Sequence, residues 1–140
     1  MRLYIDSNVL ISLLNHEFGG GLEFMEYRVQ EFLAVCAEDG HTLIASDFFL
    51  RQVSDKTMLS KDEILGYLKG LGVKVEQIVA TREMIRRNLS RLSGIKTDPE
   101  DKIHMALALE SRCDMIVTWN IKDYKPAEKV IKSIKPSDFT

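Results

Sequence analysis

Short apolar runs alternate with amphipathic segments along most of the chain. The runs have the length and composition of β-strands, and they fall at 2–5, 42–45, 73–79, 115–118 and 130–134. Between them, apolar residues recur at helical spacing, from residue 7 to the glycines at 19–21, then at 23–37, 47–59, 60–71, 81–92 and from 98 onward. Strands that are separated by helices predict an α/β fold, a three-layer α/β/α sandwich with a central parallel sheet.

Several helix ends are marked by specific residues. Ser60 and Glu63 have the spacing of a capping box, in which each side chain bonds the backbone N–H of the other residue. Pro99 is typical of a first helical position, with Asp98 before it. The helix that follows is apolar almost all round, so we expect it to be central and buried.

Length and composition favour one soluble domain over residues 1–140. The chain is 45% hydrophobic and 29% charged, which excludes a disordered or fibrous protein. Its apolar runs fall well short of the roughly 18 residues that span a bilayer, and its start lacks the features of a signal peptide. We therefore expect a cytoplasmic protein without a membrane segment. Cys36 and Cys113 are read as small buried hydrophobic residues.

The formal net charge of −2 excludes a protein that coats nucleic acid without specificity, because such proteins are markedly basic. Any contact with nucleic acid must then come from a local patch. The candidates are three arginines on one predicted helix and a lysine near the last strands: Arg82, Arg86, Arg87 and Lys122. A solvated helical face is the plainer alternative for the arginines.

Acidic residues follow the ends of predicted strands. Asp6 ends the first strand, Asp101 lies in the first turn of the buried helix, and Asp123 follows the strand at 115–118. In open parallel sheets, ligands bind at the carboxyl ends of the strands, where these elements meet. Carboxylates that are gathered there repel one another unless a divalent cation binds or their pKa values rise.

Three stretches of the chain carry a family resemblance: D-S-N-V-L-I at 6–11, D-x-x-x-x-A-x-A from Asp101, and V-T-W-N-x-x-D-Y at 117–124. In order and spacing they resemble the PIN-domain ribonucleases, and among these the VapC-type toxins. The resemblance implies an endoribonuclease that hydrolyses single-stranded RNA with Mg²⁺ or Mn²⁺. It also implies an antitoxin protein as partner, and some apolar residues of the helices at 23–71 could form a homodimer face rather than ordinary core.

Carried over by position, the resemblance gives each site residue a role. The catalytic and metal-binding acids are Asp6, Asp101 and Asp123. The supporting polar residues are Asn8, Gln52, Thr118 and Asn120. Gln52 is the departure, because the family usually has a glutamate there. An amide oxygen can accept a hydrogen bond from a metal-bound water but adds no charge, so a catalytically weak or inactive protein that binds RNA or a partner is the alternative function.

Each of these residues also has a structural alternative. Asp6 could only cap the first helix, and Asp101 could form a capping box with Asp98. Asp123 could be a solvated loop residue. His104 lacks a second histidine at ligand spacing, which favours a hydrogen-bonded core residue over a metal ligand.

Overall fold

The computed structural model describes residues 1–15 and 22–139, and its centre is a sheet of five parallel strands. The strand order is β3-β2-β1-β4-β5. The strands are β1 (Arg2–Ile5), β2 (Thr42–Ser46), β3 (Lys74–Ile78), β4 (Met115–Val117) and β5 (Lys132–Ile134). The predicted parallel sheet is confirmed.

Helices connect the strands. They are α1 (Ser7–Leu14), α2 (Leu22–Asp39), α3 (Asp47–Thr57), α4 (Lys61–Gly70), α5 (Arg82–Leu89), α6 (Pro99–Glu110) and the short α7 (Ile121–Tyr124). Ser60 and Glu63 form the predicted capping box of α4, and Pro99 opens α6 as expected. The glycines at 19–21, which we expected to end the first helix, lie outside the described residues.

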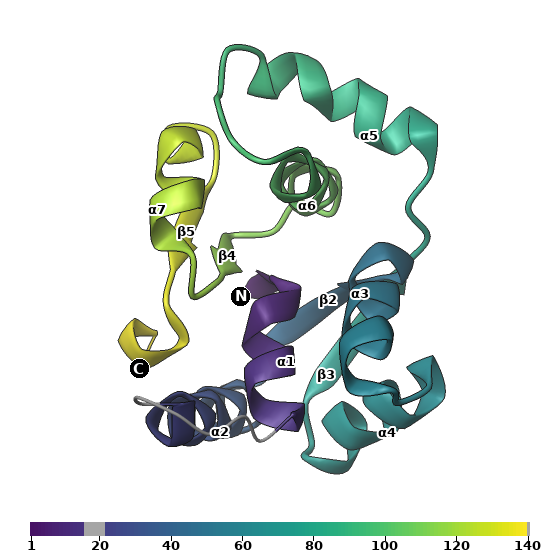
Figure 1. Ribbon diagram of the computed structural model, residues 1–140, viewed down its shortest axis with the longest axis vertical. Helices are drawn as coiled ribbons and strands as arrows, with labels where there is room; N and C mark the ends of the chain where they lie inside the picture. Colours follow the sequence, from purple (N-terminus) through teal and green to yellow (C-terminus); the bar gives the residue numbers. More distant parts are fainter. Residues whose placement is uncertain (16–21, 140) are drawn as a thin grey trace.

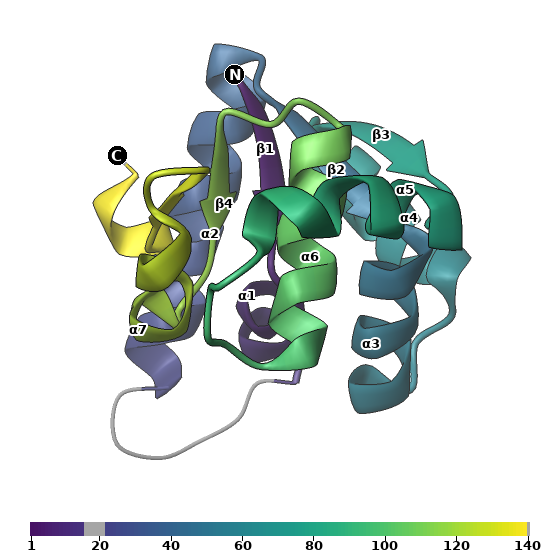
Figure 2. The ribbon, with the colours of Figure 1, turned by 90° about the horizontal axis from the view of Figure 1, so that it is seen from above.

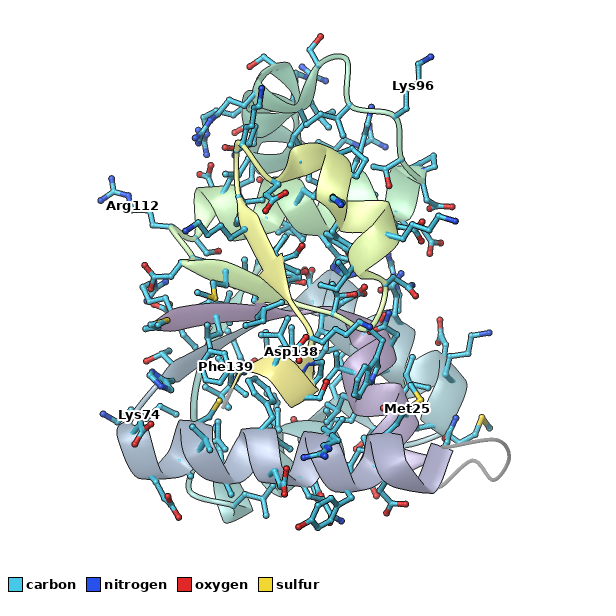
Figure 3. All side chains as sticks on the ribbon, turned by 90° about the vertical axis from the view of Figure 1, so that its left-hand side faces the viewer. Met25, Lys74, Lys96, Arg112, Asp138 and Phe139 are labelled. Atoms are coloured by element: carbon cyan, nitrogen blue, oxygen red, sulfur yellow. The ribbon has the colours of Figure 1, made fainter. Side chains whose placement is uncertain are left out.

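The helices cover both faces of the sheet, which gives the three layers that the sequence predicts (Figure 1). On one face, α1, α2 and α4 pack over a core that includes Leu3 and Phe32. On the other face, α6 packs over Tyr4 and Ile116, and α5 lies across α6 (Figure 2). Figure 3 shows the sheet edge-on between these layers, with Phe139 on the side of α2.

Strand β1 is the middle strand, and this position fixes where polar groups meet. Leu3 pairs with Leu43 of β2 on one side and with Met115 of β4 on the other. The chain runs outward from β1 through β2 to β3, then returns to lay β4 against the free side of β1. The connections therefore diverge at the carboxyl ends of β1 and β4, and such a divergence opens a crevice for ligands.

Two details differ from the sequence-based prediction. Helix α7 was not predicted, because its four residues are too few to show a helical period. The helix expected at 81–92 ends at Leu89 and continues as a 3₁₀ turn over Ser90–Leu92. Leu89, at the end of α5, is 40% exposed.

Most apolar residues of the segment at 23–71 lie in the ordinary core. Phe32, Phe49 and Ile64 are fully buried, whereas Tyr27 and Met58 are exposed. Cys36 is buried and Cys113 is half-buried. Within residues 1–15 and 22–139, no helix is both long and apolar enough to cross a membrane.

Candidate active site

Asp6 stands at the carboxyl end of β1 with its carboxylate buried. Only 4% of the residue is exposed. Its Oδ2 accepts a hydrogen bond of 2.8 Å from the Thr118 hydroxyl, and its Oδ1 lies 3.8 Å from His104 Nε2. Asp6 occupies the N-cap position of α1, but in the described part of the chain its side chain makes no capping hydrogen bond. Helix capping therefore does not explain why an aspartate is buried here.

Thr118 links the ends of the two central strands. It follows β4 directly and is fully buried. Besides donating to Asp6, its hydroxyl oxygen accepts from the backbone N–H of Asn120 at 3.0 Å and from Asn8 Nδ2 at 3.4 Å. Asn8 Oδ1 in turn accepts from the backbone N–H of Trp119 at 3.3 Å. Two of the other assigned supporting residues, Asn8 and Asn120, are thus connected to Asp6 through the Thr118 hydroxyl group.

Asp101 lies in the first turn of α6, where its carboxylate accepts a hydrogen bond of 3.4 Å from the Tyr124 hydroxyl. Burial, followed by the negative charges of Asp6, Asp98 and Asp123, raises its pKa to about 6. The Tyr124 hydrogen bond opposes this shift. Asp98 caps α6 by accepting from the backbone N–H of Glu100. The raised pKa reflects a site where negative charge accumulates without an equal positive charge.

Asp123 lies at the exposed edge of the site, on α7. Its backbone carbonyl accepts a hydrogen bond from the Thr97 hydroxyl at 2.9 Å, which joins α7 to the segment before α6. Its charge acts on Asp101. The three acids predicted from the sequence are therefore brought to one end of the sheet, with Asp6 innermost and Asp123 outermost.

Gln52 lies on α3 and takes part in a different set of hydrogen bonds. Its Oε1 is 2.6 Å from His104 Nε2, and its Nε2 donates to a carboxylate oxygen of Glu100 at 3.1 Å. The oxygen that we expected to face a metal-bound water is turned toward His104. His104 is 1% exposed, and burial lowers its pKa to about 4, so the imidazole is neutral at neutral pH. The interpretation of His104 as a hydrogen-bonded core residue is confirmed.

The four candidate RNA contacts lie on two helices, α5 and α7. Arg82 and Arg86 are exposed on α5. Arg87, also on α5, forms an ion pair with Glu110 of α6, and its hydrogen bond lowers the pKa of Glu110. Lys122 is exposed on α7. It lines a shallow hollow of about 530 Å³ next to Asp123, together with Lys125 and Lys135.

The donor set fits a hard divalent cation in chemical type. Mg²⁺ and Mn²⁺ prefer carboxylate oxygens as ligands. Asp6 supplies such oxygens at the end of β1, and Asp101 supplies them in the first turn of α6. Each carboxylate is now turned toward a hydroxyl group, Asp6 toward Thr118 and Asp101 toward Tyr124. Among the residues that the structure describes, no three histidine, cysteine or acidic side chains are grouped closely enough to hold a metal ion.

Sequence reasoning assigned no role to Tyr124, although it ends one of the quoted motifs. Tyr124 is 1% exposed, and burial, followed by the charges of Asp6 and Asp101, raises the pKa of its hydroxyl. It is therefore a neutral hydrogen-bond donor beside both acids. Its place directly after Asp123 was the signal that could have identified it.

Comparison with known proteins identifies the family. The model of the PIN domain family matches residues 2–122, which is most of the chain. This chain belongs to the PIN domain family. Its family supports a nuclease function, in agreement with the resemblance seen in the sequence. No curated protein matches the chain at the sequence level.

Solved structures share the fold of this PIN domain. A chain of VapBC-1 from nontypeable Haemophilus influenzae aligns with a TM-score of 0.60 and 13% sequence identity. The alignment covers 99% of this chain and 100% of that chain. At this identity the match establishes the three-layer PIN fold.

Proposed function

We propose that this PIN domain is a divalent-metal-dependent endoribonuclease that hydrolyses single-stranded RNA. The observation that carries the proposal is the meeting of Asp6 and Asp101 at the divergence of the central strands, where neighbouring carboxylates help to raise the pKa of Asp101. Such an excess of negative charge is what a divalent cation neutralises.

Each residue of the site has a defined task in this proposal. Asp6 and Asp101 would hold Mg²⁺ or Mn²⁺, with Asp123 at the outer edge. When bound, the cation supplies positive charge that stabilises the phosphoryl oxygens and acidifies water for attack on phosphorus. Thr118 and Tyr124 orient the two inner carboxylates through their hydroxyl groups.

The hollow beside Asp123 is suited to the RNA backbone. Lys122, Lys125 and Lys135 line it and can pair with phosphates. Trp119 also lines it, but its indole N–H donates to the Ser12 hydroxyl at 3.2 Å and its ring packs on the core. We therefore assign Trp119 to the wall of the hollow rather than to base stacking.

A cleavage assay tests the proposal. A fluorescent single-stranded RNA should be cut in Mn²⁺ and left intact in EDTA, and Asp6→Asn and Asp101→Asn should each lower the rate by about 100-fold or more. Asp62→Asn, which removes an exposed acid from the first turn of α4, should leave the rate unchanged. Equal rates in native protein, Asp6→Asn and Asp101→Asn would overturn the proposal.

Gln52 favours a second candidate, a PIN fold that binds RNA or a protein without turnover. A position usually acidic in the family holds an amide whose oxygen faces His104. RNA that binds in every sample while remaining uncut in Mn²⁺ would identify this function.

We also propose the wider role of a VapC-type toxin, supported by the fold shared with a chain of VapBC-1. In this role residues 1–140 form one domain that acts in the cytoplasm as a homodimer and is inhibited by an antitoxin protein. Induced expression should stop bacterial growth, and Asp6→Asn should abolish the effect. Light scattering of the purified chain should give twice the monomer mass.

A further inference from the structure

An apolar groove lies where α5 crosses the first turns of α6 (Figure 2). Its volume is about 630 Å³, and most of the residues that line it are apolar: Ile85, Leu89, Leu92, Pro99 and Ile103. Leu92 is buried, whereas Leu89 is 40% exposed, so the groove presents an apolar side chain to solvent. Apolar surface that is gathered in this way typically marks a place where another molecule binds.

A smaller hollow of about 230 Å³ extends this groove toward α3. Ile85 and Ile103 line both hollows, which therefore adjoin beside α6. The smaller hollow is also lined by Phe48, whose ring has contacts of its own. Arg51 Cζ lies 5.6 Å from the centre of the Phe48 ring, and the centre of the His104 ring lies 4.8 Å from it. We call the two hollows together the α5–α6 groove.

Basic residues of four helices surround the α5–α6 groove: Arg51, Lys61, Arg82, Arg86 and Lys102. Lys102 lines its larger part, and Arg51 and Lys61 line its smaller part. Arg82 and Arg86 precede the lining residue Ser90 at intervals of four residues, so the helical period places them beside the groove. In residues 1–15 and 22–139, no ion pair involves any of the five.

Acidic side chains near the groove have other partners. Of the described residues that line it, only Asp47 is acidic. Asp47 Oδ1 accepts hydrogen bonds from the backbone N–H groups of Phe48 and Ala80, at 3.0 and 2.7 Å. The charge of Glu83 acts on Arg87, which lies four residues later.

The acids that flank Pro99 are also engaged. Asp98 accepts from the backbone N–H of Glu100 at 2.9 Å, and Glu100 accepts from Gln52 Nε2 at 3.1 Å. The groove therefore has an apolar floor and a mainly positive rim, on a chain whose formal net charge is −2. An occupant that complements both carries apolar side chains and negative charges.

The floor favours a protein segment over RNA. Single-stranded RNA binds a positive groove largely through bases that stack on aromatic side chains. Among the described residues that line the groove, Phe48 alone is aromatic, and its ring already contacts Arg51 and His104. Ile85 and Leu89 are four residues apart on one helix, and aliphatic rows of this kind accept the apolar side of an amphipathic helix.

We propose that the α5–α6 groove binds an acidic amphipathic segment of a partner protein. The apolar side chains of the segment contact Ile85, Leu89 and Ile103, and its carboxylates pair with Arg86 and Lys102. This interaction goes beyond the proposed nuclease function and needs no metal ion.

The groove is separate from the acidic site. Asp101 and Ile103 both belong to α6, but two residues correspond to roughly 200° around a helix axis, so they lie on different sides of it. A docked segment does cover Arg82 and Arg86, which are the candidate RNA contacts of α5. It therefore opposes binding of RNA to this helix.

Fluorescence anisotropy with a labelled synthetic peptide tests the proposal on the full chain. In the probe, leucine recurs at helical spacing along one face and glutamate fills most other positions; a second peptide carries lysine in place of each glutamate. The glutamate peptide should bind at least about tenfold more tightly than the lysine peptide. Equal affinities, or no binding of the glutamate peptide, would overturn the proposal.

Two variants locate the peptide in the groove. Leu89→Gln and Arg86→Gln should each weaken binding of the glutamate peptide about fivefold. Leu71→Gln is the control for the first, because Leu71 is 45% exposed and also lies at the end of a helix. Lys69→Gln is the control for the second, because both residues lie in the last turn of a helix. Each control should change the affinity less than about twofold.

The remaining outcomes identify other occupants. Peptide binding should be the same in EDTA and in Mn²⁺, so its failure and the failure of the proposed metal-dependent function are distinguishable. If Leu89→Gln weakens binding of single-stranded RNA as much as binding of the peptide, the groove holds RNA. If Leu89→Gln converts a dimer to a monomer in light scattering, a second copy of the chain covers the groove. Either result overturns the proposal, as does a peptide affinity that Leu89→Gln leaves unchanged.

Discussion

At the scale of single residues, the carboxylate of Asp6 depends on one hydroxyl group. Thr118 donates to it at 2.8 Å in a site from which water is excluded. If a buried carboxylate loses its hydrogen-bond donor, nothing offsets the free energy of removing the carboxylate from water. Thr118 therefore does more than fill space at the end of β4.

Replacing Thr118 with valine keeps the shape of the side chain and removes this donor. We expect a loss of about 2 kcal/mol in the free energy of unfolding, because a buried charge is left without its hydrogen bond. Urea denaturation in EDTA measures the loss. In an Asp6→Asn background the same change should cost less, and an equal loss in both backgrounds would contradict the assigned contact.

The raised pKa of Asp101 predicts a gain in stability from a substitution at the site. Its pKa is about 6 in the folded chain against 3.8 for the free side chain, so the protonated form favours folding. That contribution is fully present below pH 3.8 and is lost as the pH rises through about 6. Above pH 6 the folded protein carries the full cost of the charge.

Asp101→Asn should thus stabilise the metal-free protein at pH 7.5 by about 1 kcal/mol, a value reduced for the partial exposure of the side chain. The gain should disappear near pH 4. Thermal melts at the two pH values in EDTA measure it, with Asp62→Asn as the control for loss of a helix-terminal charge. A destabilised Asp101→Asn at pH 7.5 would show that Asp101 mainly supports its helix.

Single residues also show where sequence reasoning stops. The places of Asp6 and Asp101 in the fold could be predicted, because one stands at the end of a strand and the other at the start of a helix. The contacts of His104 with Tyr4 and Gln52 span 100 and 52 residues, and no local pattern encodes such distances. The orientation of Gln52, and with it the position of Glu100, needed the folded chain.

At the scale of elements, the arginines of α5 differ in what they contact. Arg87 is paired with Glu110 and joins α5 to α6, whereas in the described ranges no ion pair involves Arg82 or Arg86. A guanidinium that already binds a carboxylate is less available to a phosphate. The patch that the sequence suggested therefore consists of two residues with different tasks.

We expect the double change Arg82→Ala and Arg86→Ala to weaken binding of single-stranded RNA. The slope of log K against log salt concentration should become shallower by about 0.7 for each phosphate contact that is lost. Arg87→Ala should leave both nearly unchanged and should instead lower thermal stability. Fluorescence anisotropy at several salt concentrations compares the variants. If the double variant shows the same salt dependence as the native chain, α5 lies outside the RNA path.

Helix starts were predicted correctly where residues of the first turn mark them. The capping box of Ser60 and Glu63 and the proline that opens α6 were correctly predicted, because these residues satisfy backbone groups in their own turn. Helix α7 was missed, although it carries Asp123 and Tyr124. Its position is set by packing of Tyr124 beneath Asp6 and Asp101, which is a tertiary effect.

At the scale of the whole molecule, occupation of the site should be visible in global stability. A ligand that binds only the folded chain at 100 times its Kd adds about 2.7 kcal/mol, which corresponds to roughly 10 °C in melting temperature for a domain of this size. Mn²⁺ should produce such a rise, EDTA should reverse it, and Asp6→Asn should prevent it. Differential scanning fluorimetry measures all three, and an equal rise in Asp6→Asn would place the ion elsewhere.

The fold class was predictable because the hydrophobic period distinguishes strands from helices along the chain. Buried strands alternating with helices allow few arrangements, and the position of β1 between β2 and β4 then brings Asp6 to Thr118. Which side chains face one another across that crevice depends on packing between distant helices, and this part could not be derived from the chain alone.

The central place of β1 has a consequence for synthesis on the ribosome. Asp6 is translated before its partner, because the hydroxyl that orients it belongs to a residue 112 positions later. The acids can come together only after the segment from Asp101 to Tyr124 has left the exit tunnel. On the proposed nuclease function, a nascent chain that has been translated only as far as α5 therefore holds no complete site.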